Sequence, residues 1–161
     1  MAEIVSIVYQ PKELAYEDGR FDYFIRVPIQ QANLIANYGI EGDRKARRNS
    51  NRQLNLLSED WLTARQEEGY KTDPGDFGEQ ITLSGLSVLN LKPGTILQLG
   101  DAAQIEITRL RTPCSRLAAA QGLEGKWPGG PIGVLAKVIS SGLIQVGDPI
   151  MEIERANLSI S

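Results

Sequence analysis

The sequence contains no histidine and one cysteine among its 161 residues. The lack of histidine excludes Ser-His-Asp and Cys-His catalysis, and any histidine-ligated metal site, within this chain. The lone cysteine, Cys114, excludes an internal disulfide and a zinc site built from several thiolates. Any chemistry of this chain must therefore use Cys114, carboxylates, lysines or a cofactor that brings its own ligands.

Aromatic residues are also scarce, at 6% of the sequence, and the net charge is −3 at pH 7. Both values argue against nucleic-acid binding, which needs stacking platforms and basic surfaces. No apolar run approaches the roughly 20 residues that span a bilayer. The N-terminus lacks the basic and apolar regions of a signal peptide. We therefore expect a cytoplasmic protein with no nucleic-acid partner and no membrane partner.

The length predicts one domain over residues 1–161, with a core of useful size. Residues 103–108 alternate, with Ile105 and Ile107 expected inside and Gln104 and Glu106 outside. Ser58 and Gly69 are typical of the two ends of a helix. Other segments expected as strands are 3–9, 24–35 with interruptions, 54–57, 77–83, 87–90, 95–99, 132–140 and 145–154, the last split by Gly147-Asp148-Pro149. A short helix is expected over 114–121. The pattern predicts a mainly β fold with a few short helices, closed into a barrel or sandwich.

The first candidate functional motif is Thr112-Pro113-Cys114, which follows a strand-like run and precedes a helix-like run. Arg111 and Arg116 flank it, and nearby positive charge favours the thiolate, which attacks electrophiles and binds soft metals. The alternative is that Cys114 is a small buried hydrophobic residue.

The second motif begins at Gly39 and ends in a loop with five basic side chains between residues 44 and 52. Arginine side chains match phosphate oxygens, and glycine-bounded turns expose peptide N–H groups, so this loop can bind phosphate. The alternative is a solvated basic loop.

The third motif runs from Asp73 to Ile81 and contains the sequence Gly75-Asp76-Phe77-Gly78-Glu79. Gly78 would let the backbone approach a ligand, and Glu79 could act as an acid, a base or a hydrogen-bond acceptor. The alternative is a turn stabilised by its own carboxylates. We predict that Arg44, Glu79, Arg111 and Cys114 line one pocket, because loops from several strands converge at a barrel mouth.

Together, these motifs resemble the MOSC domain family, named for the C-terminal region of molybdenum cofactor sulfurases. The matching segments are Gly39-Ile40-x-Gly42-Asp43-Arg44, Arg52-Gln53-Leu54-x-Leu56-Leu57-Ser58, Pro74-Gly75-Asp76-Phe77-Gly78-Glu79-x-Ile81, Leu91-x-x-Gly94 with Leu99-Gly100, and Thr112-Pro113-Cys114. The resemblance covers residues 3 to 154. Lys45 stands where the family often has histidine, and Gln80 stands where it commonly has asparagine.

The resemblance implies a closed, β-barrel-like fold with a pocket near the cysteine that holds the molybdenum cofactor, molybdopterin. Cys114 would be the metal ligand or would carry sulfur as a persulfide, which suits a soft thiolate. Cys114 and Glu79 would be the catalytic residues. The residues that would contact the cofactor are Asp43, Arg44, Arg52, Phe77, Gly78, Arg111 and Thr112.

Related single-domain proteins suggest reduction of N-hydroxylated compounds. The chain has no flavin, nicotinamide or iron–sulfur motif, so a separate protein would have to donate electrons or sulfur. The alternative is a non-catalytic module that delivers or senses the cofactor, or one that has lost it.

Overall fold

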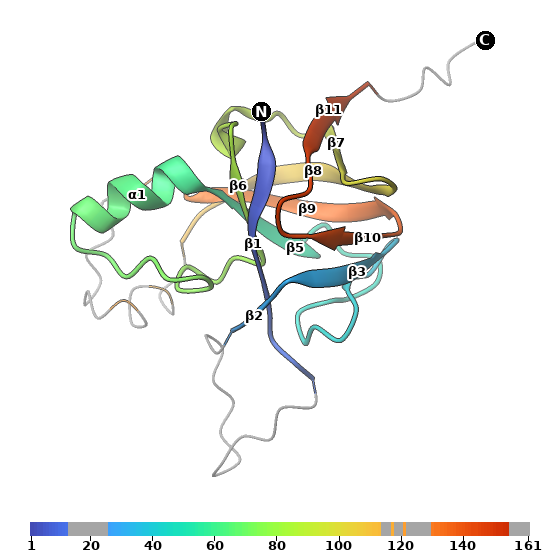
Figure 1. Ribbon diagram of the computed structural model, residues 1–161, viewed down its shortest axis with the longest axis horizontal. Coiled ribbons are helices and arrows are strands. Elements are labelled where there is room, and N and C mark those ends of the chain that lie inside the picture. Colours follow the sequence, from blue (N-terminus) through green and yellow to red (C-terminus); the bar gives the residue numbers. More distant parts are fainter. Residues whose placement is uncertain (13–25, 114–116, 118–120, 122–129, 155–161) are drawn as a thin grey trace.

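The computed structural model describes residues 1–12, 26–113, 117, 121 and 130–154. Eight strands form one sheet in the order β11-β7-β8-β9-β5-β6-β1-β2 (Figure 1). Their bounds are β1 Glu3–Tyr9, β2 Val27–Ile29, β5 Leu54–Ser58, β6 Ile81–Ser84, β7 Ile96–Leu99, β8 Ala103–Arg111, β9 Gly133–Ser140 and β11 Ile150–Ile153. A smaller sheet has the order β10-β3-β4, with β10 Gly142–Gln145, β3 Gln31–Ile35 and β4 Gly39–Ile40.

The main core lies between these two sheets. Residues of the small sheet, including Leu34, Ile40 and Ile144, pack in one buried cluster with residues from β1, β5, β6, β7, β8 and β9. Ile105 and Ile107 have no exposed surface, whereas Gln104 and Glu106 on the same strand are partly exposed. The alternation expected over 103–108 is confirmed, because one face of β8 is in the core.

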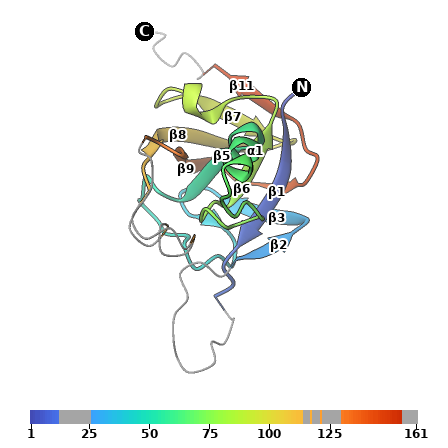
Figure 2. The same cartoon turned by 90° about the vertical axis from the view of Figure 1, so that its left-hand side faces the viewer.

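The helix α1 (Glu59–Glu67) connects β5 to β6, which are parallel neighbours. Parallel neighbours need a crossover connection, and a helix is the usual one. Figure 2, which views this side, shows α1 in front of β5 and β6. Gly69 follows the helix with a φ of +97°, and the N–H of Tyr70 donates to the carbonyl of Arg65 at 3.1 Å. This end is a Schellman motif, as the glycine at position 69 predicts.

The start of the helix differs from the expectation. Ser58 stands at the N-cap position, but its side chain makes no capping hydrogen bond. Its hydroxyl instead donates to the carbonyl of Leu86 at 3.1 Å and accepts from the N–H of Val88 at 2.8 Å. Residues 87–90 were expected to form a strand, and this expectation is wrong: Val88–Asn90 form a 3-10 helix, η2. Ser58 joins η2 to the end of β5.

The mainly β class is confirmed, but a fully closed barrel is not found in the described residues. The edge strands of the large sheet are β11 and β2. The start of β1 meets the segment before β11 through the single bridge Glu3–Pro149, flanked by hydrogen bonds such as Ile4 N–H to the Asp148 carbonyl at 3.0 Å. On the other side of the bridge the N–H of Ile150 donates to the carbonyl of Ala2 at 3.0 Å, so the two edges of the sheet meet over only a few residues.

Other boundaries also depend on single residues. β6 begins at Ile81 rather than at residue 77, because Gly75 and Gly78 both have positive φ and coil the chain before it. The split expected in 145–154 at Gly147-Asp148-Pro149 is confirmed: Gln145 ends β10, and β11 begins at Ile150. Most of the expected helix 114–121, including Cys114, lies outside the described residues.

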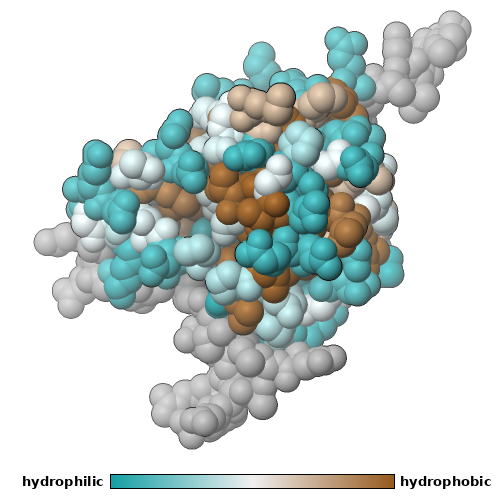
Figure 3. Space-filling view, in the orientation of Figure 1, coloured by the Kyte–Doolittle hydropathy of each residue, from teal (hydrophilic) through white to brown (hydrophobic). Residues whose placement is uncertain are grey.

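The face in Figure 3 is mainly polar, with apolar side chains gathered over the centre. In the described part of the chain, no helix is both long and apolar enough to cross a membrane.

Candidate functional site

The segment from Asp73 to Gln80 is a tightly coiled loop that leads into β6. Within it, the N–H of Asp76 donates to the carbonyl of Asp73 at 2.9 Å, and the N–H of Gly78 donates to the carbonyl of Gly75 at 2.8 Å. Gly75 and Gly78 have φ values of +89° and +76°, a region that disfavours residues with a side chain. The two glycines thus allow the loop to fold back around the side chain of Glu79.

Glu79 lies inside this loop with 1% of its surface exposed. One carboxylate oxygen accepts from the N–H of Gly75 at 2.8 Å, and the other accepts from the N–H of Phe77 at 3.1 Å. Burial raises the pKa of Glu79 above its ordinary value, while the peptide hydrogen bonds and the nearby Arg111 guanidinium oppose the rise. Burial prevails, so this carboxyl holds a proton at higher pH than a free glutamate.

Two arginines converge on Gly78, one residue before Glu79. A β-carbon on Gly78 would lie 3.0 Å from Nη2 of Arg111 and 3.9 Å from Nη2 of Arg26. Arg111 ends β8, and Arg26 precedes β2, so the two come from opposite regions of the large sheet. The absence of a side chain at Gly78 therefore admits both guanidinium groups beside a buried carboxyl.

Asp43 connects the Gly-Asp motif to this loop from within the protein. It has no exposed surface, and its Oδ1 accepts from the N–H of Gln10 at 3.0 Å. Its Oδ2 accepts from the side-chain amide of Gln80 at 3.3 Å, and the carbonyl oxygen of that amide accepts from the N–H of Asn55 at 2.7 Å. Asp43 thus places the 43–45 segment next to Gln80, and all the contacts it makes here are with protein groups.

In the basic loop over residues 44–52, some side chains are hydrogen-bonded to the protein and others face solvent. Nη2 of Arg44 donates to the carbonyl of Lys12 at 3.0 Å, so this guanidinium is used to hold the chain after β1. Arg52 is exposed, and within the described residues no hydrogen bond or ion pair joins its side chain to Glu79 or Arg111. The loop is nevertheless ordered by contacts such as the N–H of Asn49 to the Asn37 side chain at 3.0 Å.

Phe77 is a packing residue by position. Its ring has no exposed surface and makes an edge contact with Trp61 at a centroid distance of 5.0 Å. It shares a second core cluster with Leu57, Leu62, Leu117 and Ile132. Thr112, in contrast, is exposed just after the end of β8.

Cys114 lies outside the described residues, and so the prediction that it shares a pocket with Arg44, Glu79 and Arg111 stays a prediction. Of the other three, the structure brings Glu79 and Arg111 together. Leu117 is described, and it lies in the same cluster as Phe77. Gln121 is described as well: its amide donates to the carbonyl of Lys71 at 2.9 Å and its oxygen accepts from the Lys71 N–H at 2.8 Å.

Sequence reasoning missed Arg26 and Gln121. Arg26 sits in an extended run without a motif, and Gln121 was expected only as the end of a helix. No three His, Cys, Asp or Glu side chains form a potential metal site within the described residues. The metal site that the sequence predicts, a single thiolate with a cofactor that carries its own ligands, stays a prediction, because Cys114 lies outside the described residues.

Several proteins are similar to this chain. Protein YiiM of Escherichia coli is 24% identical over 165 residues, which cover 93% of this chain and 72% of YiiM. A reductase of Gibberella moniliformis is 31% identical over 104 residues, which cover 60% of this chain and 18% of the reductase. The chain thus spans less than a fifth of that reductase.

Solved structures share the fold. The crystal structure of YiiM from Geobacillus stearothermophilus superposes with a TM-score of 0.73 and 24% identity, covering all of this chain and 80% of YiiM. The YuaD protein of Bacillus subtilis superposes with a TM-score of 0.68 and 18% identity, covering 93% and 94% of the two chains. The sequence model of the MOSC domain matches residues 43–151, which begin at Asp43 of the Gly-Asp-Arg motif and include the whole Thr-Pro-Cys motif. The protein belongs to the MOSC domain family.

Proposed function

We propose that this chain binds a molybdopterin-type cofactor beside Gly78 and uses Cys114 as its molybdenum ligand or as a sulfur carrier. The convergence of Arg26 and Arg111 on the side of Gly78 where a side chain would project, next to the buried Glu79, is the observation that carries this proposal. Cys114 follows Arg111 by three residues in the sequence. One of the two binding arginines, Arg111, is thus close to the thiol in the sequence.

The donor groups fit the chemistry of such a cofactor. Its phosphate and the oxygens and nitrogens of its pterin accept hydrogen bonds, and arginine guanidinium groups donate in pairs to such acceptors. The absence of a side chain at position 78 lets the Arg111 guanidinium lie beside the loop backbone, where it can donate to a ligand. Arg44, Arg52 and Thr112 remain candidates for further contacts, although Arg44 also holds the Lys12 carbonyl.

Glu79 has the properties of a proton donor. Removal of the oxygen from an N-hydroxylated compound as water consumes two protons and two electrons. Burial keeps the Glu79 carboxyl protonated to higher pH than usual, and the two peptide N–H groups fix its orientation. When bound, the cofactor supplies the two-electron redox chemistry, and the electrons come from a separate donor protein. A reducing compartment such as the cytoplasm suits a chain whose single thiol must stay free.

The test is to express the protein in a host that makes the cofactor and to measure molybdenum content and pterin fluorescence. Arg111→Ala should weaken cofactor binding by about 1.5–3 kcal/mol, the value of a charged hydrogen bond. Arg109→Ala is the matched control, because it removes the same charge from an exposed position on the same strand. Equal cofactor loading of the two variants would remove Arg111 from the site.

Cys114→Ser tests the role of the thiol. If the thiol ligates molybdenum or carries sulfur, this variant should retain the fold but lose the metal or the persulfide.

An activity assay of the wild-type protein separates an enzyme from a delivery or sensing module. If the wild-type protein loads cofactor but reduces no N-hydroxylated compound with any electron donor tried, a delivery or sensing module becomes the better description.

A further inference from the structure

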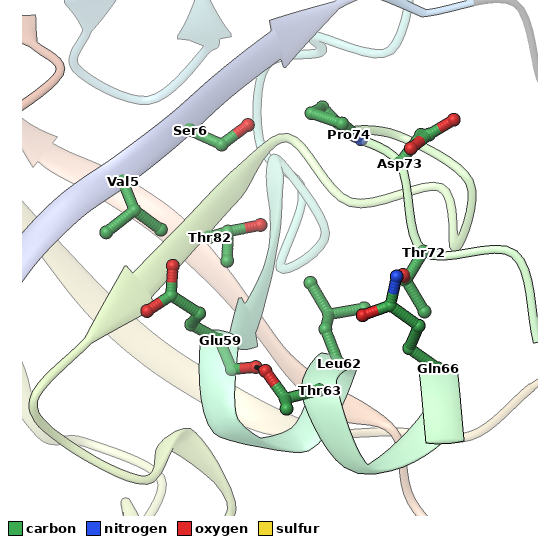
Figure 4. Close-up of a pocket in the computed structure, with 10 residues that line it drawn as sticks. All are labelled: Val5, Ser6, Glu59, Leu62, Thr63, Gln66, Thr72, Asp73, Pro74 and Thr82. Atoms are coloured by element: carbon green, nitrogen blue, oxygen red, sulfur yellow. Dashed lines mark hydrogen bonds between the residues drawn. The ribbon is translucent and has the colours of Figure 1, made fainter. Parts of the chain in front are cut away.

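A pocket of about 300 Å³ lies between α1, the strands β1 and β6, and the segment 72–74 (Figure 4). It is separate from the candidate cofactor site, because Arg26, Gly78, Glu79 and Arg111 do not line it. Its volume is at the lower end of the range of small-molecule sites.

A β-bulge in β1 helps to form this pocket. Ile4 pairs with Leu83 and Ser6 pairs with Thr82, so Val5 is an extra residue in β1. Ile4 and Ile7 are buried in the main core, whereas Val5 and Ser6 are partly exposed and both line the pocket. Bulges re-aim side chains in this way and are frequent next to binding sites.

The helix contributes a face that is unusually polar. Glu59, Leu62, Thr63 and Gln66 line the pocket and lie at the i, i+3, i+4 and i+7 positions that share one helix face. In a helix that packs on a sheet this face is normally apolar, yet here only Leu62 is buried. Polar side chains therefore border the space where apolar packing would be expected.

Thr82 places a hydroxyl group on the wall of the pocket. It lies between two core residues of β6 and points to the opposite face, into the pocket (Figure 4). Only 4% of its surface is exposed, yet its hydroxyl oxygen is not among the fully buried side-chain atoms of the described residues that lack a hydrogen-bond partner. The hydroxyl therefore belongs to the pocket wall, where an N–H group of a bound molecule can donate to it.

The charge of the lining indicates the class of ligand. Glu59 and Asp73 line the pocket, and among the described residues no lysine or arginine lines it. Val5, Leu62 and Pro74 supply an apolar surface beside these carboxylates. We propose that this pocket binds a small organic cation, an amine or amidinium, whose apolar body rests on these three residues and whose N–H groups reach the carboxylates and the Thr82 hydroxyl.

Three probes of the same shape test the charge requirement. Benzamidine, benzamide and benzoate share one ring and carry a positive, a neutral and a negative group. Titrations followed by protein NMR should give the affinity order benzamidine, benzamide, benzoate, with the largest shifts for Val5, Thr63 and Thr82. Equal affinities for benzamidine and benzamide would overturn the cation assignment, and no binding of any probe at millimolar concentration would overturn the site.

Two pairs of variants test the residues. Glu59→Gln should weaken benzamidine binding by about threefold to fivefold, as expected for an exposed charge pair, and should leave benzamide binding unchanged. Glu67→Gln, on the same helix but outside the pocket, is its control. Thr82→Val keeps the shape of the side chain and should weaken both probes, whereas Thr95→Val should weaken neither. If Glu59→Gln and Thr82→Val bind the probes with the same affinities as their controls, and have the melting temperature of the wild type, the proposal is wrong.

Discussion

The guanidinium of Arg111 lies so close to Gly78 that its Nη2 atom is 3.0 Å from the position a β-carbon of residue 78 would take. This distance is at the limit of normal contacts to a β-carbon, so any side chain at position 78 would move Arg111. Since the φ of Gly78 is +76°, the backbone also favours glycine there. One residue thus fixes both the coil of the loop and the place of a cation.

Gly78→Ala should therefore have two effects that can be separated. The left-handed backbone should cost about 1–2 kcal/mol of unfolding free energy, and the displaced Arg111 should weaken binding of inorganic phosphate or cofactor. Gly94→Ala is a matched control, because Gly94 has a φ of +94° and an added β-carbon there would meet nothing within 4 Å. Chemical denaturation and phosphate titration measure the two effects. If both variants lose stability equally and both bind phosphate like the wild type, Arg111 does not serve the site through Gly78.

Glu79 should make the stability of the protein depend on pH. Its pKa is raised from the ordinary 4.5, so above that value the folded chain holds a proton that the unfolded chain releases. The contribution of the Glu79 carboxyl to the unfolding free energy is complete below pH 4.5 and is lost as the pH rises through the pKa of Glu79 in the folded protein. The unfolding free energy should fall across this window.

Glu79→Gln should remove this pH dependence. It should also destabilise the protein by about 1–3 kcal/mol, because an amide cannot accept from the N–H groups of both Gly75 and Phe77. Denaturation curves between pH 4 and pH 8 provide the measurement, with the exposed Glu67→Gln as control. A variant that keeps the wild-type pH profile would show that Glu79 is ionised throughout.

Periodic features of this fold could be predicted from the sequence, whereas contacts made by single side chains could not. Alternation located β8 and its buried isoleucines, and one glycine located the end of α1, because both features repeat a local rule of backbone geometry. Ser58 is at the N-cap position, as predicted, but it does not make the predicted capping hydrogen bond. Its hydroxyl is hydrogen-bonded to the backbone of Leu86 and Val88, some 30 residues away in sequence. No local pattern specifies such a partner.

The candidate site shows the same division. Gly78, Glu79 and Arg111 were identified from motifs, and the structure places them together. Arg26 was not identified, because it reaches Gly78 only after β1 and β2 pair and bring distant segments together. Asp43 was predicted to contact a cofactor, and the described contacts of its buried carboxylate are with Gln10, Lys45 and Gln80.

The buried hydroxyl of Ser58 should be important for stability. Ser58→Ala removes the acceptor of the Val88 N–H and the donor to the Leu86 carbonyl, and leaves both peptide groups without this partner. A loss of about 1–3 kcal/mol is expected. Ser87→Ala, which removes an exposed hydroxyl with no capping hydrogen bond, should change the stability by no more than about 0.5 kcal/mol. Equal losses in urea denaturation would contradict the assigned role of Ser58.

The two faces of β8 should respond differently to truncation. Ile107→Ala leaves a cavity in the main core and should cost about 2–5 kcal/mol of unfolding free energy. Glu106→Ala should cost less than about 1 kcal/mol, because Glu106 is partly exposed and its cross-strand neighbour Lys137 forms at most a surface pair with it. Thermal denaturation of both variants at one pH distinguishes them. Similar melting temperatures would mean that the core is not organised around this strand.

The last prediction concerns the reactivity of Cys114. Arg111 and Arg116 lie within three residues of it in the sequence, and nearby positive charge lowers the pKa of a thiol. Alkylation with iodoacetamide should therefore reach half of its maximal rate well below the pH of about 8.5 that is typical of a free cysteine. Because the chain has a single cysteine, mass spectrometry reports this site without interference.

Two variants test the source of the activation. Arg111→Gln should move the midpoint upward, whereas Arg109→Gln, which removes an exposed charge two residues earlier, should move it less. A midpoint at or above that of the urea-unfolded protein would show that the thiol is not activated, and the proposed role of Cys114 as ligand or sulfur carrier would then lose its chemical basis.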